Sequence, residues 1–150
     1  MRTLVTALFL FLALAPLAGQ AQAPANVLEG TWKLISQREV YPDTVIVTQR
    51  VPPSIKILNS THFAWGYQTE DGEDVQAGGG RYTLVGDSIY IEHIQYHTSG
   101  ALVGLDIHFD ARVVGDSLWY HTGIFPTGYR LEEVWRRVEP APRLTNYRRY

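Results

Sequence analysis

Hydrophobic and polar residues alternate along most of the chain between residues 30 and 138, in short runs that glycine, proline, asparagine or aspartate residues interrupt. This period of two is typical of β-strands that bury one face. We predict an all-β domain of eight or nine strands with short connections, which suits a single antiparallel up-and-down barrel. The predicted strands are 30–38, 44–48, 54–58, 61–68, 81–85, 89–93, 105–113, 118–122 and 129–138.

The last of these segments, 129–138, fits two patterns. Leu131, Val134, Trp135 and Val138 follow the i, i+3, i+4, i+7 spacing of an amphipathic helix. As a strand, the same segment alternates only loosely. We predict a strand, because a series of hairpins needs a last partner that covers its open edge.

A hairpin signal occurs twice. The segment LVGDSIY at 84–90 is echoed as VVGDSLW at 113–119. Gly-Asp between two apolar runs is typical of a two-residue hairpin loop. With such loops, Leu84 pairs with Ile89 and Val113 pairs with Leu118. In both hairpins, this register places the apolar residues on one face of the sheet and the polar residues on the other.

This register predicts one apolar and one polar face. The apolar face carries Tyr82, Leu84, Ile89, Ile91, His93, Ile107, Phe109, Ala111, Val113, Leu118 and Tyr120. The polar face carries Arg81, Glu92, His108, Asp110, Arg112 and His121, with Trp119 also pointing outward. A shift of one residue would exchange the two faces.

The segment 78–80 consists of three glycines. A phosphate-binding loop would require a helix and usually a lysine after it, whereas a strand pattern follows here. We therefore predict a bend or bulge in the sheet.

Residues 70–74, with the sequence EDGED, form an acidic segment. The spacing of an EF-hand calcium loop is missing. We interpret the segment as the solvated tip of a hairpin.

The first 23 residues have the features of a cleavable leader. Arg2 precedes an apolar run at 4–15, and Ala21-Gln22-Ala23 is a small-x-small cleavage site. Gln20 stands where a lipoprotein would carry its lipidated cysteine. We predict a signal peptide at 1–23, a barrel at 24–139, a flexible basic tail at 140–150, and a secreted or periplasmic protein without a membrane anchor.

Composition narrows the function classes. The chain has no cysteine, which excludes disulfides, thiol catalysis and cysteine metal sites. Its formal charge is −2, and removal of Arg2 with the leader makes it −3. Such a weakly acidic balance argues against a nucleic-acid partner, whose binding surface would be basic.

Several ordered motifs resemble a known group of proteins. Gly30-Thr31-Trp32 resembles the Gly-x-Trp of lipocalins and other calycins. Together with the sequences THFAW at 61–65, GGGRY at 78–82, EHI at 92–94, WYH at 119–121 and EEVW at 132–135, it is similar to a lipocalin-like family of exported bacterial proteins without assigned activity. The resemblance implies a barrel with a cavity, and an arginine, Arg136 or Arg137, packed over Trp32.

Aromatic residues dominate the candidate ligand site. A small barrel can either fill its centre with side chains or hold one small ligand, and the sequence is compatible with both. We expect a small hydrophobic or amphipathic ligand and no cofactor. The candidate ligand-binding residues are Trp32, Phe63, Trp65, Tyr67, Tyr82, His93 and Tyr120.

Signs of catalysis are weak. The chain lacks a Gly-x-Ser-x-Gly elbow and a His-Glu-x-x-His zinc motif, and we assign no catalytic residue. His93 or Glu92 would move protons in a rival isomerase or cyclase, although His93 also suits a hydrogen-bonded place in the core. A metal ion bound between neighbouring strands would have as its ligands Glu92, His108 and His121. The alternative is that these are ordinary residues of the outer face. A second rival, an envelope interaction protein, would use an outward Trp119.

Overall fold

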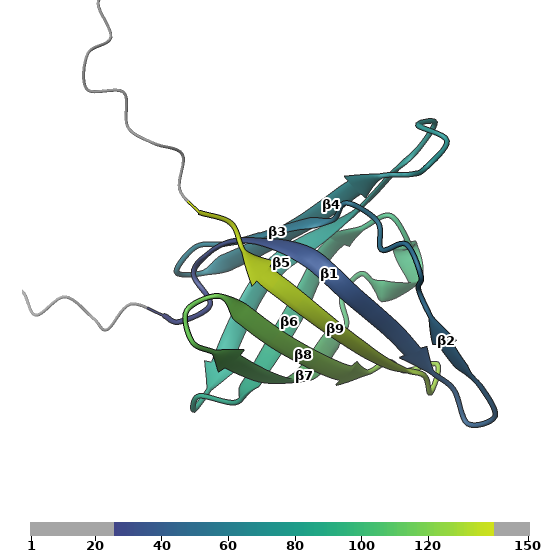
Figure 1. Ribbon diagram of the computed structural model, residues 1–150. Helices are drawn as coiled ribbons and strands as arrows, with labels where there is room; N and C mark the ends of the chain where they lie inside the picture. Colours follow the sequence, from purple (N-terminus) through teal and green to yellow (C-terminus); the bar gives the residue numbers. More distant parts are fainter. Residues whose placement is uncertain (1–25, 140–150) are drawn as a thin grey trace, which may run out of the picture.

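The computed structural model describes residues 26–139, which form one antiparallel sheet of nine strands (Figure 1). The sheet order is β2-β1-β3-β4-β5-β6-β7-β8-β9, and β9 also pairs with β1. The strands are β1 (Gly30–Val40), β2 (Val45–Val47), β3 (Ile55–Leu58), β4 (His62–Gln68), β5 (Val75–Val85), β6 (Ile89–His97), β7 (Asp106–Val114), β8 (Leu118–Ile124) and β9 (Arg130–Arg137). A short 3-10 helix, η1 (Gly100–Leu102), lies between β6 and β7.

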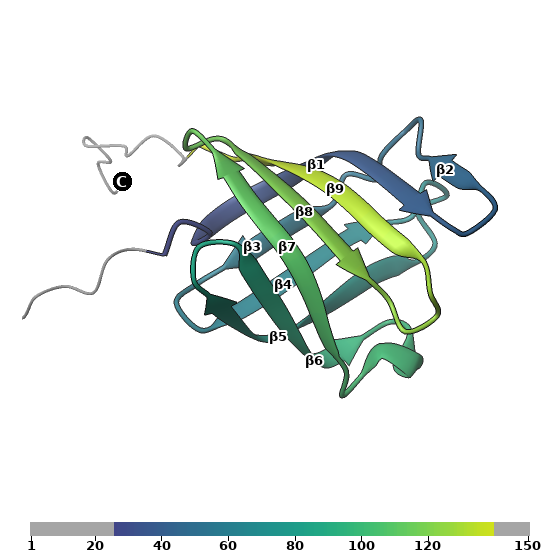
Figure 2. The same cartoon turned by 90° about the horizontal axis from the view of Figure 1, so that it is seen from below.

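Pairing of β1 with β9 closes the sheet into an eight-stranded barrel, with β2 attached outside it as a ninth strand (Figure 2). The closing register runs from Trp32 opposite Arg137 to Val40 opposite Arg130. The predicted up-and-down barrel is therefore confirmed. The strand predicted at 129–138 is confirmed as well, because β9 pairs with β1 and thereby removes the open edge of the sheet.

The predicted hairpin register is wrong by one residue in both repeats. The turns contain three residues, so Val85 pairs with Ile89 and Val114 pairs with Leu118. Gly86 opens the first turn with φ +60°, in the left-handed region that glycine enters without steric cost. A three-residue loop is the next commonest hairpin connection after the two-residue loop, and sequence alone did not separate them here.

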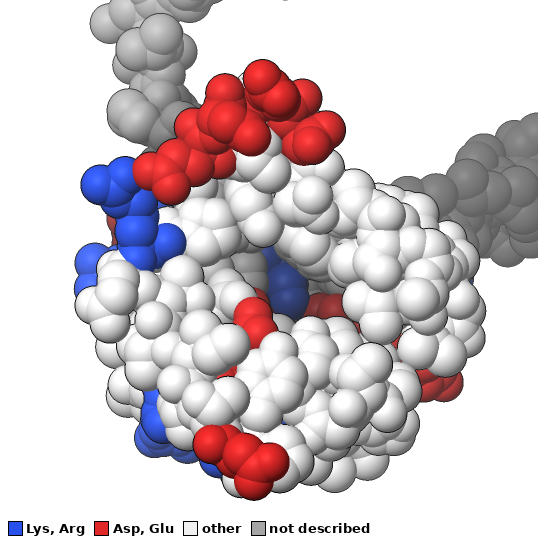
Figure 3. Space-filling model, turned by 90° about the vertical axis from the view of Figure 1, so that its right-hand side faces the viewer, with Lys and Arg blue, Asp and Glu red and all other residues white. Residues whose placement is uncertain are grey.

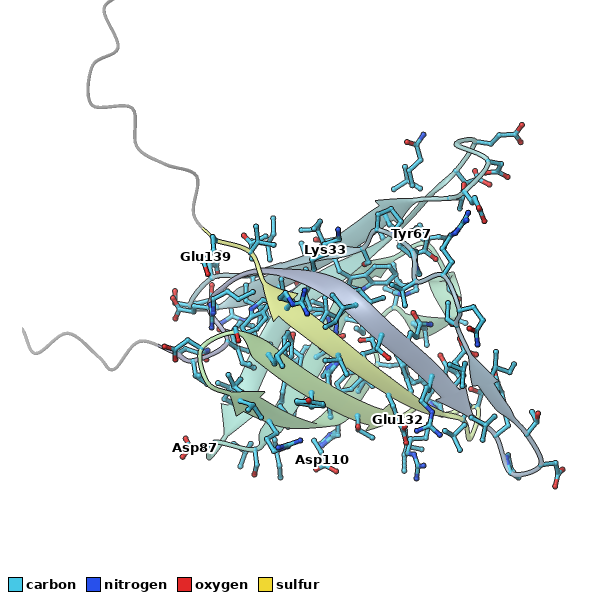
Figure 4. The ribbon with its side chains drawn as sticks, viewed as in Figure 1. Lys33, Tyr67, Asp87, Asp110, Glu132 and Glu139 are labelled. Atoms are coloured by element: carbon cyan, nitrogen blue, oxygen red, sulfur yellow. The ribbon has the colours of Figure 1, made fainter. Side chains whose placement is uncertain are left out.

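This shift reverses the faces of β6 and β8. Tyr90 and Trp119 are 0% exposed, whereas Ile89 is 38% exposed. Glu92 and His121 are buried inside the barrel, and Ile89, His93 and Tyr120 belong to the outer face. The first strand of each hairpin keeps its predicted orientation, with Ile107, Phe109 and Ala111 buried and Asp110 outside (Figure 4).

The bulge predicted at the three glycines is confirmed. The register between β5 and β6 shifts between Gly79 and Gly80. A Cβ atom at Gly80 would collide with the carbonyl oxygen of His93, so the close approach of the strands requires glycine there. The acidic segment is likewise the tip of the β4–β5 hairpin, where Thr69 donates a hydrogen bond to Asp71.

Trp32 closes one end of the barrel. Its indole Nε1 donates to the Leu28 carbonyl oxygen over 2.8 Å, and the Arg137 guanidinium lies 4.1 Å from its ring centroid. Arg137 also donates to the carbonyl oxygens of Val27, Glu29 and Asp116. The predicted stacking of a late arginine on Trp32 is confirmed.

Within residues 26–139, no helix has the length and apolar character that crossing a membrane requires. The predicted signal peptide at 1–23 and the predicted tail at 140–150 lie outside the described residues. Both stay predictions.

Candidate functional site

The barrel contains a cavity of about 210 Å³ that opens at the end opposite Trp32. Figure 3 looks into its mouth, where white atoms surround a hollow with one basic side chain and acidic side chains in its depth. Lys56 is the single Lys or Arg among the described residues that line the cavity. The lining combines an apolar and aromatic wall with a polar floor, which is the usual composition of a small-molecule pocket.

Aromatic rings from two sides of the barrel form the wall near the mouth. On β4, the rings of Trp65 and Tyr67 stack with centroids 6.2 Å apart. On the β8–β9 connection, the rings of Phe125 and Tyr129 stack at 4.7 Å. His97 of β6 meets Trp65 edge-on. Flat rings of this kind offer contact area to a ligand at little cost in side-chain entropy.

A buried ion pair lies at the cavity floor. Lys56 Nζ is 2.8 Å from Glu92 Oε1, and both side chains are almost completely shielded from solvent. The ammonium also lies within 6.0 Å of the centroids of five aromatic rings, those of Phe63, Tyr90, Phe109, Trp119 and Trp135. Charge pairing and cation–π contacts together offset the cost of removing the ammonium from water.

A second polar group lies beside this pair. His121 Nδ1 is 3.0 Å from Glu133 Oε2, and Trp135 Nε1 donates to the same oxygen over 2.9 Å. Burial would raise the pKa of Glu133, but the hydrogen bond from His121 and the charge of Lys56 outweigh it and lower the pKa. Burial, together with the charge of Lys56, lowers the pKa of His121. The pair is therefore a neutral imidazole that donates to a carboxylate.

Three buried polar atoms near the floor lack a hydrogen-bond partner among the described residues. They are Tyr90 Oη, Trp119 Nε1 and His121 Nε2. Burial and then the charge of Glu92 raise the pKa of Tyr90 well above its ordinary value. Tyr90 therefore stays a neutral phenol. Unpartnered groups in an interior are costly and call for an explanation, such as a bound molecule.

The seven predicted ligand residues lie in three different places: in the cavity lining, in the packed core and on the outer face. Trp65 and Tyr67 line the cavity, and their contact with a ligand stays a prediction. Trp32 and Phe63 belong to the packed core and do not line the cavity. Tyr82 donates to the Asn59 carbonyl oxygen and accepts a hydrogen bond from Asn26, also away from the cavity lining.

The remaining two predicted ligand residues, His93 and Tyr120, lie outside the barrel, because the one-residue register shift turns them outward. His93 contacts Thr83 Oγ1 at 2.9 Å and Asp106 Oδ1 at 2.7 Å. Tyr120 stacks under Arg112. The same correction changes the rival roles. His93 does not face the cavity, whereas Glu92, the other residue of the rival enzyme, lines it. Trp119 is buried and offers no outer contact surface.

The suggested metal ligands are also divided. Glu92 and His121 are buried inside the barrel, and His108 is on the outer face. Residues 26–139 contain no group of three or more His, Asp or Glu side chains arranged to hold a metal ion.

Sequence reasoning missed the polar floor. Lys56 lies between Ile55 and Ile57, so hydrophobicity alone points the lysine outward. The pairing of β3 with β4 places Lys56 opposite Trp65. A register argument from the predicted inward face of Phe63, Trp65 and Tyr67 could have found it.

Comparison with known proteins places the chain in a family. The profile of the family described as "Domain of unknown function (DUF4488)" matches residues 27–143. None of the curated proteins matches the chain.

Solved structures resemble the barrel at low sequence identity. A redesigned β-barrel matches with a TM-score of 0.55 and 14% identity, over 79% of this chain and 100% of that one. A lipocalin-like protein from Bacteroides uniformis ATCC 8492 matches with a TM-score of 0.49 and 16% identity, over 75% of this chain and 99% of that one. A de novo designed fluorescence-activating β-barrel matches with a TM-score of 0.43 and 18% identity, over 76% of this chain and 96% of that one. At these identities, the likeness concerns the fold alone.

Proposed function

The chain belongs to the DUF4488 family, and we propose that it is an exported binding protein that holds one small, partly hydrophobic molecule inside its barrel. One observation carries this proposal: the open cavity has aromatic walls and a floor of buried polar groups. A barrel that served only as a rigid scaffold would gain stability from filling this space with apolar side chains.

The features of the leader support export. Arg2, the apolar run at 4–15 and the Ala21-Gln22-Ala23 site have the order of a secretory signal. N-terminal sequencing of the protein from its own host tests this part of the proposal. A mature chain that begins at Pro24 supports export, and an uncleaved chain in the cytoplasm contradicts it.

Binding is tested with the small-molecule extract of the host. Fractions of the extract are added to the purified protein, and both the melting temperature and the tryptophan fluorescence are followed. We expect one fraction to raise the melting temperature, since a ligand of the native state stabilises it in proportion to its concentration and affinity.

Two variants then locate the binding site. Trp65→Ala removes a cavity wall and should reduce the shift in melting temperature. Tyr120→Ala removes an aromatic ring from the outer face and serves as the matched control. Equal responses from both variants, or the absence of any active fraction, would contradict a ligand in the barrel.

The His121–Glu133 pair favours a second candidate function, proton transfer at the cavity floor. A carboxylate that orients a neutral imidazole through Nδ1 leaves Nε2 as a base. The captured molecule would be incubated with the protein in D₂O and weighed by mass spectrometry. Deuterium incorporation that His121→Gln abolishes would support catalysis, and unchanged mass would contradict it.

A further inference from the structure

The charges around the cavity are unequal. Three carboxylates line it, those of Glu39, Glu92 and Glu133, against the single ammonium of Lys56. The two lining histidines do not correct this imbalance. Burial is the main reason that the pKa values of His97 and His121 are lowered, so both rings are neutral at pH 7.

The floor also presents acceptor atoms, beside the unpartnered donors of Tyr90 and Trp119. Lys56 contacts Glu92 through Oε1, and His121 and Trp135 both reach Glu133 through Oε2. Among the described residues, no hydrogen bond reaches the second oxygen of Glu133. His121, 1% exposed and part of the cavity wall, adds an unpartnered Nε2, which accepts because Nδ1 carries the proton.

The walls suit a cation as well. The rings of Trp65, Tyr67, Phe125 and Tyr129 line the mouth, and aromatic rings attract cations through their quadrupole. Acidic side chains gather at the upper rim in Figure 3, and Glu70, Asp71, Glu73 and Asp74 at the β4–β5 tip are all exposed. Arg50 pairs with Glu70, and the other acidic side chains of the tip raise the local concentration of cations near the entrance.

We propose that the cavity selects a small organic cation, an amine attached to an aromatic or short aliphatic body, whose ammonium donates to the free oxygen of Glu133. This inference deepens the proposed binding function and depends on it. The size is consistent: a dry cavity of about 150 Å³ accepts benzene, and this cavity of about 210 Å³ has room for a ring with a short amine arm.

Three probes of nearly equal size and different charge test the proposal. They are 2-phenylethylamine (cationic), 2-phenylethanol (neutral) and phenylacetate (anionic), each titrated into the full-length protein by calorimetry at pH 7. We expect the amine to bind at least tenfold more tightly than the alcohol, and phenylacetate to bind more weakly than both.

Two isosteric variants assign the preference to the floor. Glu133→Gln removes one negative charge inside the cavity and should lower the preference for amine over alcohol at least fivefold. Glu132→Gln removes a neighbouring charge on the outer surface (Figure 4), where Glu132 pairs with Arg38 and Arg130, and should leave the preference unchanged. If Glu133→Gln does not fold, Glu39→Gln at the mouth is expected to lower the preference in the same direction.

The outcomes distinguish the preference for a cation from the proposed binding function on which it depends. An alcohol or a carboxylate that binds as tightly as the amine overturns the cation preference and leaves the binding function standing. Failure of all three probes overturns the preference too, and the host-extract experiment then decides separately whether the barrel binds any ligand.

Discussion

Lys56 Nζ and Glu92 Oε1 lie 2.8 Å apart in the interior of the barrel. Replacing either residue by an uncharged one is costly, because the remaining charge is then buried without a counter-charge in a region that water hardly reaches. This pair forms the floor of the cavity and fixes the relative positions of β3 and β6 across the barrel.

Removal of one partner of this pair should be far more costly than removal of both. We expect Glu92→Leu or Lys56→Met alone to lower the free energy of unfolding by about 3–5 kcal/mol, since each leaves the other group buried without its partner. The double variant Lys56→Met/Glu92→Leu should recover most of the loss. Urea denaturation measures all three, and a strictly additive double variant would contradict a buried pair.

The Arg137 contacts predict a role in holding the closed end. Arg137→Lys should lower the unfolding free energy by about 2 kcal/mol, because lysine cannot donate to three carbonyl oxygens while covering Trp32. Arg136→Lys, one residue earlier and exposed, is the matched control and should have little effect. Tryptophan fluorescence during urea denaturation reports both. Equal losses in the two variants would refute this role.

Stability should fall as the pH drops below about 6.5, the ordinary pKa of histidine. The folded pKa of His121 is lowered by burial and by Lys56, so the unfolded chain binds more protons in this range and acid favours it. Below about 4.3, the ordinary pKa of glutamate, the lowered pKa of Glu133 adds a loss of the same sign.

Melting temperatures at pH values from 4 to 8 test this dependence. His121→Gln should make the profile between pH 5 and 7 shallower, with the lowered pKa of His97 retaining part of the slope, and His108→Gln on the outer face should preserve the profile. A parent profile that is level from pH 8 to pH 5 would show that the burial of a neutral His121 does not contribute.

The three-residue turn at 86–88 should be essential for the register. Deletion of Ser88 would shift β6 by one residue, which turns Tyr90 and Glu92 outward and leaves Lys56 without its partner. We expect loss of the cooperative fold, measured by near-ultraviolet circular dichroism and urea denaturation. Insertion of one glycine after Gly72, at the exposed tip of β4–β5, should change stability by less than about 0.5 kcal/mol. A Ser88 deletion that unfolds like the parent would contradict the register.

The strands and their antiparallel closure were predictable because alternation is a local property. Even the ambiguous segment 129–138 was assigned correctly, since the edge of the sheet required a partner. Gly30-Thr31-Trp32 and a late arginine also predicted the closed end, where Arg137 now lies over Trp32.

The polar floor was not predictable from alternation. Assigning apolar residues to the interior places Ile57 inside and Lys56 outside, whereas Ile57 is 54% exposed and Lys56 is buried. The same assumption chose the two-residue turn that put His93 inside in place of Glu92. A barrel that buries charge at a candidate binding site breaks the hydrophobic rule there, as functional sites often do.

Native mass spectrometry of the protein, purified gently from its own host, tests the central claim most directly. We predict an additional mass of one small molecule, lost on denaturation, reduced in Trp65→Ala and retained in Tyr120→Ala. A protein of unmodified mass that no molecule from the host extract stabilises would contradict a ligand-binding barrel.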